Sequence, residues 1–454
     1  MTLYRWQSLI IIVPALALAL LLGAIIARFE FGVRELIILF FIIWVGGAVF
    51  VQNRAVILGT FYLWILTFAL GYRSLYLTPL VNITPGEALP WILAALLAIK
   101  SVLVREPQRW SLGRGWFLFA GFGIFASIFA FIQGVNPEVI LNELKLILLM
   151  IPVSYVIATL VIDLKTLSTS TILAILSGCM VIVPLLLALF VPGMSGTMVA
   201  LGLLSEGQKR LDGFTPYGFF AWASIASMLF VPLLGLVWAQ IVSSKTRQKR
   251  FLFIGAGLVL LIGIYASGTR GAWLAVAAML LAALSLQFRR TIWLFLAAIG
   301  ASIILPSAFE NRFFSVFSVN TWDSSAFKRF DRAEQALELF QQSPLVGNGL
   351  GSSGWPHNDW VWMMANMGIF SVIVLILCLA RLVKDLWHEV RSDQTRAETA
   401  PFAAGLLLTV VGLVVLFTFE GLFVVNILMP MVWFMLALAA QLPKLAQPKG
   451  KLHG

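Results

Sequence analysis

The chain has 454 residues, of which 61% are hydrophobic and 11% are charged. A soluble protein cannot cover its surface with so few charged side chains, so the composition excludes a soluble globular class and predicts an all-α polytopic membrane protein. The formal net charge of +11 would suit a nucleic-acid partner by its sign alone. The positions of the basic residues must therefore decide whether the positive charge serves nucleic-acid binding or membrane topology.

Apolar segments long enough to cross a bilayer recur along the sequence. A hydrocarbon core of about 30 Å requires about 20 apolar residues in a helix. The first segment is too long for the apolar core of a signal peptide and lacks a following small-residue cleavage site, so we expect it to remain as an anchor. In all we expect 12–14 transmembrane helices, and the fourteen segments lie at residues 8–27, 35–51, 55–73, 87–104, 115–133, 144–162, 168–190, 217–242, 251–267, 271–288, 291–309, 358–383, 401–419 and 422–441.

The basic residues follow the loops between these spans. With the N-terminus inside, 19 of the 31 basic residues fall in cytoplasmic segments, as the positive-inside rule requires. The charge is therefore mostly topological, and no nucleic-acid partner is expected. The same orientation places residues 191–216, 267–270 and 310–357 together on the outer side. The predicted organisation is an N-terminal transmembrane bundle at 1–309, a large outer loop at 310–357, and C-terminal helices with a cytoplasmic tail at 358–454.

The large outer loop contains a predicted amphipathic helix at residues 323–342. Apolar residues recur in it at near-helical spacing, and Ser343-Pro344 ends it. The remaining positions carry charges that include Lys328, Arg329 and Arg332. Such a helix would lie along the outer membrane–water boundary. Two roles remain open, a lid packed on the bundle with a solvated charged face, or a helix that contacts the substrate.

One of the three histidines occupies a position suited to chemistry. His388 lies in a charged linker and His453 in the tail, whereas His357 lies at the mouth of the span beginning near residue 358. An imidazole is the side chain that most readily exchanges a proton near neutral pH. His357 is therefore a candidate general base, and the alternative is a capping or packing histidine.

Two other outer segments carry arginines at the edge of the hydrocarbon. The segment 191–216 contains Lys209 and Arg210, and the short turn Ser267-Gly268-Thr269-Arg270-Gly271 joins two spans. Arg210 either anchors the next span by snorkelling or binds an anionic ligand. Arg270 has no adjacent acidic residue in the sequence, and an arginine at a span end without a local partner is a functional candidate. Guanidinium groups bind phosphate oxygens at two points, which suits a pyrophosphate at the membrane surface.

Metal and nucleotide sites are not predicted. Cys179 and Cys378 both fall inside spans, so neither a disulfide framework nor a Cys/His metal site is expected. The glycine-rich turn at 347–351 lacks the preceding strand and the glycine spacing of a dinucleotide-binding fingerprint, and no P-loop is present. The expected chemistry uses a pre-activated lipid phosphate and needs neither a cofactor nor a metal.

Residues 217–383 resemble the O-antigen ligase and polymerase superfamily in the order and spacing of their motifs. The turn at 267–271 followed by a span, the outer helix with its arginines, and a histidine ahead of the next span carry the resemblance. The segments that carry it are Ser267-Gly268-Thr269-Arg270-Gly271, the helix bearing Arg329 and Arg332, Ser343-Pro344-Leu345-Val346-Gly347-Asn348-Gly349, His357-Asn358-Asp359-Trp360, and Met367-Gly368-Ile369-Phe370. Members often carry an acidic residue shortly before the last of these glycines, where this chain has Asn366 and Met367.

The resemblance implies a GT-C-like, metal-independent, inverting glycosyltransferase of the bacterial inner membrane with its active site on the periplasmic side. O-antigen ligases move a glycan from undecaprenyl pyrophosphate to a sugar hydroxyl of lipid A–core. By this resemblance His357 would be the base, and Arg210 and Arg270 the pyrophosphate clamp. The expected substrate-binding residues are Lys209, Lys328, Arg329, Arg332 and Asn358. The implied partners are the undecaprenyl-pyrophosphate-linked glycan donor, the lipid A–core acceptor and membrane lipids.

Three alternatives stay open from the sequence. An O-antigen or exopolysaccharide polymerase and a protein O-oligosaccharyltransferase share the chemistry and differ in the acceptor. A transporter or flippase for lipid-linked sugars is a different class. Ion-coupled transporters place ionisable residues at mid-membrane, whereas the polar residues here gather on one side, which favours an enzyme.

Overall fold

The computed structural model describes residues 75–78, 81–83, 85–104, 110–191, 193, 223–286, 324–391, 398–423 and 428–446. The predicted spans at 8–27, 35–51, 55–73 and 291–309 lie outside the described residues, and so do Lys209 and Arg210. Each of the other predicted spans corresponds to helical structure.

The regular secondary structure of the described residues is helical apart from one short hairpin, in which β1 pairs antiparallel with β2. This confirms the predicted all-α class. Two segments are β1 (Leu75–Thr78) and β2 (Val81–Ile83), and the helices are α4 (Pro85–Val104), α5 (Arg114–Ile132), α6 (Pro137–Leu148), α7 (Met150–Leu160), α8 (Leu164–Phe190), α10 (Ala223–Ser243), α11 (Arg247–Ser267), the helix Arg270–Leu286, α14 (Ser324–Gln342), α15 (Asp359–Arg391), α16 (Ala400–Phe419) and α17 (Met429–Ala446).

Within the described ranges, eight helical segments are long and apolar enough to cross a membrane, with α6 and α7 together forming the segment Pro137–Leu160. Two shorter apolar segments are Pro90–Ile99, which lies within α4, and the helix Arg270–Leu286. The amphipathic helix predicted at 323–342 is present as α14 and ends where Ser343-Pro344 was expected to stop it. The protein is therefore a polytopic α-helical membrane protein, as the composition indicated.

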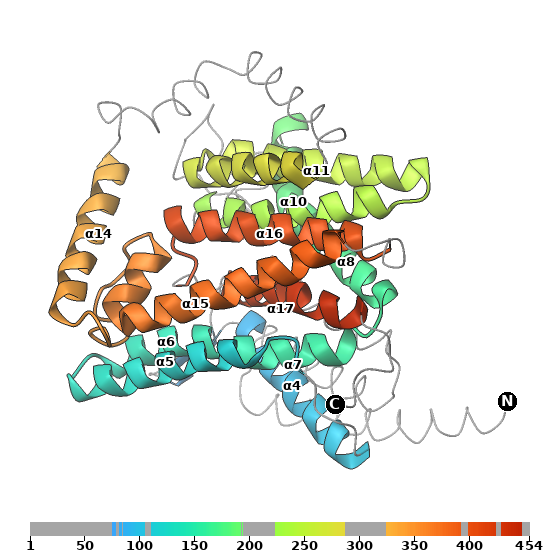
Figure 1. The fold of residues 1–454 in the computed structure, drawn as a ribbon. Coiled ribbons are helices and arrows are strands. Elements are labelled where there is room, and N and C mark those ends of the chain that lie inside the picture. Colours follow the sequence, from blue (N-terminus) through green and yellow to red (C-terminus); the bar gives the residue numbers. More distant parts are fainter. Residues whose placement is uncertain are drawn as a thin grey trace, which may run out of the picture.

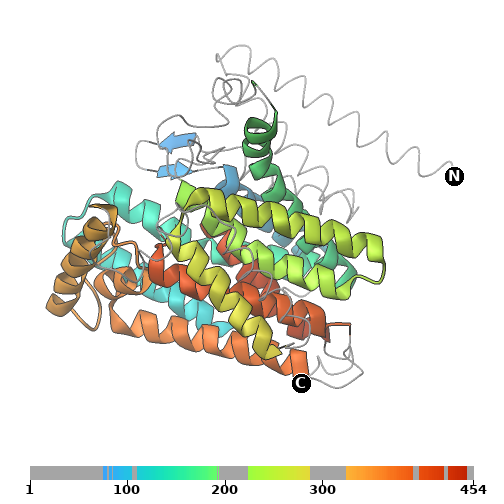
Figure 2. The same cartoon turned by 90° about the horizontal axis from the view of Figure 1, so that it is seen from above.

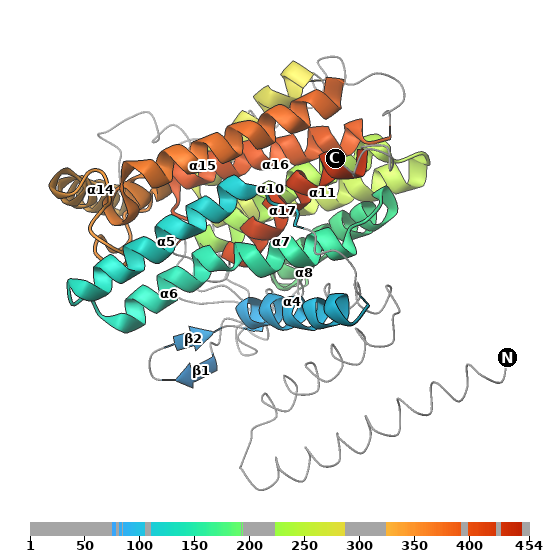
Figure 3. The ribbon, with the colours of Figure 1, turned by 60° about the horizontal axis from the view of Figure 1, so that its bottom comes forward.

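Most of the helices run side by side, and α14 stands across one end of the bundle (Figure 1). Figure 2, seen from above, again places α14 at that end. Figure 3 shows α4 and the β hairpin on one side of the bundle, next to α6 and α7. The helix that carries Arg329 and Arg332 thus covers the ends of spans rather than crossing beside them.

Hydrogen bonds between distant segments define the two ends of the bundle. At one end, Lys444 Nζ of α17 donates to the carbonyl of Ser111 at 2.7 Å. At the other end, Arg329 of α14 donates to the carbonyl of Phe419 at 3.3 Å, and Gly271 packs against Glu420. The turn at 267–271 and the outer-loop helix, which were predicted to share one side of the membrane, therefore share one end of the bundle.

Close packing against α10 fixes the position of α16, whose C-terminal end lies next to Glu420. A Cβ on Gly235 would lie 2.5 Å from the carbonyl oxygen of Gly405, so only glycine allows the two backbones to approach this closely. Thr409 Oγ1 adds a hydrogen bond to the carbonyl of Pro232 at 2.9 Å. The position of the C-terminal end of α16, just before Glu420, follows from this contact.

Helix α15 is interrupted at Gly368, which has φ +76° and ψ 172°. The preceding loop inserts at the break, because the N–H groups of Asn348 and Gly349 donate to the carbonyls of Ala365 and Asn366 at 2.8 and 3.0 Å. Any Cβ at residue 368 would overlap the backbone of Leu345. The glycine-rich turn is therefore a structural joint that holds the loop on α15.

Two predicted boundaries are wrong for identifiable reasons. The span expected at 144–162 begins earlier, because the Asn136 side chain caps a helix that starts at Pro137. The span expected at 422–441 begins later, at Met429, because residues 420–423 form a buried turn with Gly421 at φ +69°. Hydropathy counts Leu422 and Phe423 as helix-compatible, although their backbone is not helical.

Candidate active site

Two arginines on α14 face the end of the bundle. Arg329 and Arg332 are three residues apart, which places them on one side of a helix about one turn from each other. Lys328, which precedes Arg329 in the sequence, is exposed. Phe327 and Phe330 are also exposed, at 49% and 55%. The helix thus presents apolar side chains outward and two guanidinium groups toward the spans, as an interfacial helix would.

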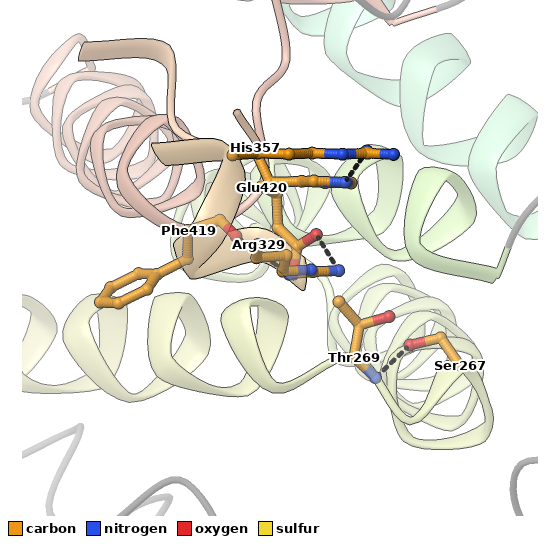
Figure 4. Close-up of polar contacts among 7 residues, drawn as sticks. Ser267, Thr269, Arg329, His357, Phe419 and Glu420 are labelled. Carbon is orange, nitrogen blue, oxygen red and sulfur yellow. Dashed lines mark hydrogen bonds and ion pairs between the residues drawn. The ribbon is translucent and has the colours of Figure 1, made fainter. Parts of the chain in front are cut away.

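Arg329 pairs with Glu420, the residue that follows α16. Arg329 Nη2 lies 3.4 Å from Glu420 Oε2, and Nη1 donates to the carbonyl of Phe419 at 3.3 Å. The Glu420 side chain is only 1% exposed, whereas that of Arg329 is 31% exposed. The hydrogen bond to Phe419 joins residues 90 positions apart in the sequence. Figure 4 shows this pair beside His357.

Arg332 contacts the predicted general base. Its Nη1 lies 3.4 Å from Nε2 of His357. The imidazole stacks on Trp355, with ring centroids 4.1 Å apart and 27° between the planes. His357 has φ +56°, the only non-glycine residue in the described ranges with positive φ. A non-glycine residue held in this conformation is uncommon and is often found at functional positions.

The environment keeps His357 neutral. Its pKa is lowered from 6.5 to about 3, first by burial and then by the positive charges of Arg329 and Arg332. Because a guanidinium can only donate, Nε2 must be the unprotonated nitrogen in this contact. The neutral ring then carries its proton on Nδ1, which is buried and has no hydrogen-bond partner among the described residues. The lone pair that would accept a proton therefore points at Arg332.

The start of α15 is fastened to the turn that carries Glu420. Both carboxylate oxygens of Asp359 accept backbone N–H groups, from Leu422 at 2.6 Å and from Phe423 at 2.9 Å. Asn358 Oδ1 accepts the N–H of Val361 at 3.1 Å and so caps the helix. The predicted substrate-binding role of Asn358 stays a prediction, and the structure gives this side chain a capping contact.

The turn that carries Arg270 lies at the same end of the bundle. Helix α11 ends at Ser267, Gly268 adopts the left-handed conformation with φ +61°, and a new helix begins at Arg270. A Cβ on Gly271 would lie 2.7 Å from Glu420 Oε1, so the turn packs directly on the acid that pairs with Arg329. Arg270 is half-buried. Figure 4 shows Ser267 and Thr269 of this turn next to Arg329 and Glu420.

A second polar cluster holds the loop that leads to His357. Asn366 Oδ1 accepts the N–H groups of Ser352 and Ser353 at 3.1 and 3.2 Å, and Gly351 donates to Glu143 Oε2 of α6 at 2.7 Å. The amide of Asn366 holds the loop through these contacts. These contacts hold the loop that leads to His357 and do not involve the two arginines of α14.

The structure therefore brings together Arg270, Arg329, Arg332 and His357 from the predicted set. Sequence reasoning missed Glu420 and Asp359 as members of the site. Both are acids at the ends of predicted spans, and this position was the only signal that pointed to them. Among the described residues no group of three or more His, Cys, Asp or Glu side chains could hold a metal ion. The prediction that the chemistry needs no metal stays a prediction.

Residues 255–376 match the family described as O-antigen ligase. The match begins in α11, ends within α15, and contains Arg270, Arg329, Arg332 and His357. No curated protein matches the chain. The family match confirms the resemblance drawn from the motifs, and it supports a ligase or polymerase type of glycosyl transfer. Through residues 255–376, the chain is similar to the O-antigen ligase family.

Proposed function

We propose that this protein is the O-antigen ligase of a bacterial inner membrane, with its active site on the periplasmic side. It would move a glycan from undecaprenyl pyrophosphate to a sugar hydroxyl of lipid A–core, without a metal and with inversion at the anomeric carbon. The observation that carries the proposal is the neutral imidazole of His357 held beside Arg332 at the ends of membrane spans, within a family-matched segment.

The donor pyrophosphate is expected to bind the arginines at this end of the bundle. Arg329 and Arg332 are one helical turn apart, and the turn bearing Arg270 packs on the partner of Arg329. Guanidinium groups stabilise the charge that develops on the leaving pyrophosphate as the glycosidic bond breaks. Arg210 and Lys209, from the sequence-based hypothesis, would complete the clamp, and Lys328, which is exposed, would meet outer phosphates of donor or acceptor.

His357 is expected to accept the proton of the acceptor hydroxyl. In the transfer step the acceptor oxygen forms a bond to the anomeric carbon, the bond from that carbon to the phosphate oxygen breaks, and the hydroxyl proton passes to Nε2. Arg332 Nη1 lies 3.4 Å from Nε2. A phosphate that draws Arg332 to itself would free this lone pair, so donor binding would prepare the base for the acceptor.

Reconstitution with purified substrates tests the proposal. The protein in liposomes would receive undecaprenyl-pyrophosphate-linked glycan and lipid A–core, and transfer would be followed by gel mobility of the lipopolysaccharide product. The ligase proposal predicts glycan on lipid A–core. Glycan chains that lengthen on the donor would identify a polymerase instead, and transfer to a pilin acceptor would identify a protein glycosylating enzyme. Movement of the donor across the bilayer without transfer would identify a transporter.

A further inference from the structure

Asp359 joins two segments that are distant in the sequence. Its side chain is fully buried, and its two oxygens accept the N–H groups of Leu422 and Phe423, 63 and 64 positions away. A buried carboxylate with both oxygens on backbone donors fixes direction as well as distance. Asp359 therefore ties the first turn of α15 to the turn after α16.

Each of these two segments carries one of the groups that meet α14. On the α15 side, His357 contacts Arg332, and on the α16 side, Glu420 pairs with Arg329. The spacing between imidazole and carboxylate must match the spacing of two arginines one helical turn apart. Asp359 is two residues from His357, and its partners Leu422 and Phe423 are two and three residues from Glu420, so the tie constrains this match.

The segments also touch directly, which leaves little room for a different arrangement. A Cβ on Gly421 would lie 2.5 Å from Trp355 Nε1 and 3.1 Å from the Cα of His357. His357 is held at φ +56°, a conformation that persists in a non-glycine residue only where the surroundings enforce it. The tie, the stack on Trp355 and the close fit of Gly421 supply that enforcement.

We infer that Asp359 is a positioning residue for glycosyl transfer, which acts by holding the imidazole of His357 and the carboxylate of Glu420 in register with Arg332 and Arg329. The inference rests on the proposed function of His357 as the base. Asp359 itself does not touch the substrate in this assignment. It fixes the turn on which the catalytic geometry depends, and a misplacement of about 1 Å at such a distance from the chemistry costs about 10²-fold in rate.

The first test is Asp359→Asn, which keeps the shape and replaces one acceptor oxygen by an NH2 group. That group cannot accept an N–H, so half of the tie is lost. We expect the turnover number to fall about 10–100-fold, with the donor KM changed less than about 2-fold because the arginines remain. Glu389→Gln is the matched control, since Glu389 is a buried acid at the opposite end of α15. It should keep wild-type kinetics.

The second test, Gly421→Ala, disturbs the same contact from the other segment and changes no charge. The charges that act on His357 are those of Arg329 and Arg332 from α14. The substitution leaves both arginines in place, and also Glu420 of the turn after α16 and Asp359 of α15. The added methyl should push the turn from Trp355 and admit water to the imidazole. The rate should then acquire a fall at acid pH near 6.5, where a solvated imidazole gains its proton. A purely structural role would lower the yield of folded protein without moving the pH profile.

The outcomes separate the two hypotheses. If the wild-type protein and Glu389→Gln transfer glycan to none of the acceptors, the proposed function fails and the inference fails with it. If the wild type transfers, while folded Asp359→Asn keeps its turnover number or folded Gly421→Ala keeps both turnover and pH profile, the inference alone is overturned. If Asp359→Asn does not insert into the membrane, the Gly421→Ala result decides.

Discussion

His357 offers the sharpest prediction, because its imidazole lies beside Arg332 and burial lowers its pKa. As a general base it contributes about 10²–10⁴-fold to turnover, so His357→Ala should lose that factor, equivalent to about 2.7–5.4 kcal/mol in the transition state. Donor binding should be retained, because the arginines of α14 and the 267–271 turn remain. His388→Gln, in the last turn of α15, is the matched control and should behave as wild type.

The pH dependence follows from the pKa of about 3. A lowered pKa means that the imidazole stays neutral as the pH falls, and protonation begins only near that value. At pH 5 about 99% of the rings are neutral, whereas an ordinary imidazole with pKa 6.5 would be about 3% neutral. The wild-type rate should therefore be nearly constant from pH 5 to 8, while an unperturbed base would give about a 30-fold decrease at pH 5.

The assay is single-turnover transfer of labelled glycan from undecaprenyl pyrophosphate to lipid A–core in liposomes. Measuring the chemical step in buffers from pH 5 to 8 separates proton transfer from product release. A folded His357→Gln protein with wild-type turnover would refute the base assignment, because glutamine restores hydrogen bonds without restoring a base. A wild-type rate that falls near pH 6.5 would refute the buried, neutral imidazole.

The remaining predictions concern the arginines, metal dependence and the break in α15. Arg210→Ala and Arg270→Ala should each abolish most transfer in folded protein, and lysine should rescue poorly because a point charge cannot reproduce the two-point contact; near-normal lysine variants would exclude a clamp. Transfer should continue in excess EDTA, and a loss that magnesium or manganese restores would reveal a metal site. Gly368→Ala should lower the free energy of unfolding by about 1–3 kcal/mol or more, and with it the melting temperature and the yield of folded protein, since φ +76° and contact with the Leu345 backbone both oppose a Cβ. Gly121→Ala should leave these properties unchanged, because the space at its Cβ is open. Equal thermal stability of the Gly368→Ala and Gly121→Ala variants would show that the break does not need glycine.

The sequence by itself determined the elements that local chemistry controls. Within the described residues, hydropathy located the spans because a bilayer demands continuous apolar helix. The helix predicted at 323–342 appears as Ser324–Gln342 because its periodicity and the following Ser343-Pro344 are local signals. The motif order that resembled O-antigen ligases lay within one continuous stretch, so it too was visible in the sequence. The start points of α6 and α17 were predicted less well, since hydropathy registers neither the cap at Asn136 nor the difference between a buried turn and a helix.

The tertiary structure alone decided which polar groups meet. Arg329 and Phe419 are 90 positions apart, Arg332 and His357 are 25 apart, and Asp359 reaches Leu422 across 63. No periodicity relates residues at such separations, because their contact depends on how whole helices pack, as α10 does on α16. The neutral state of His357 arises in the same way. Its pKa depends on burial and on charges delivered by another helix, and neither quantity exists until the chain has folded.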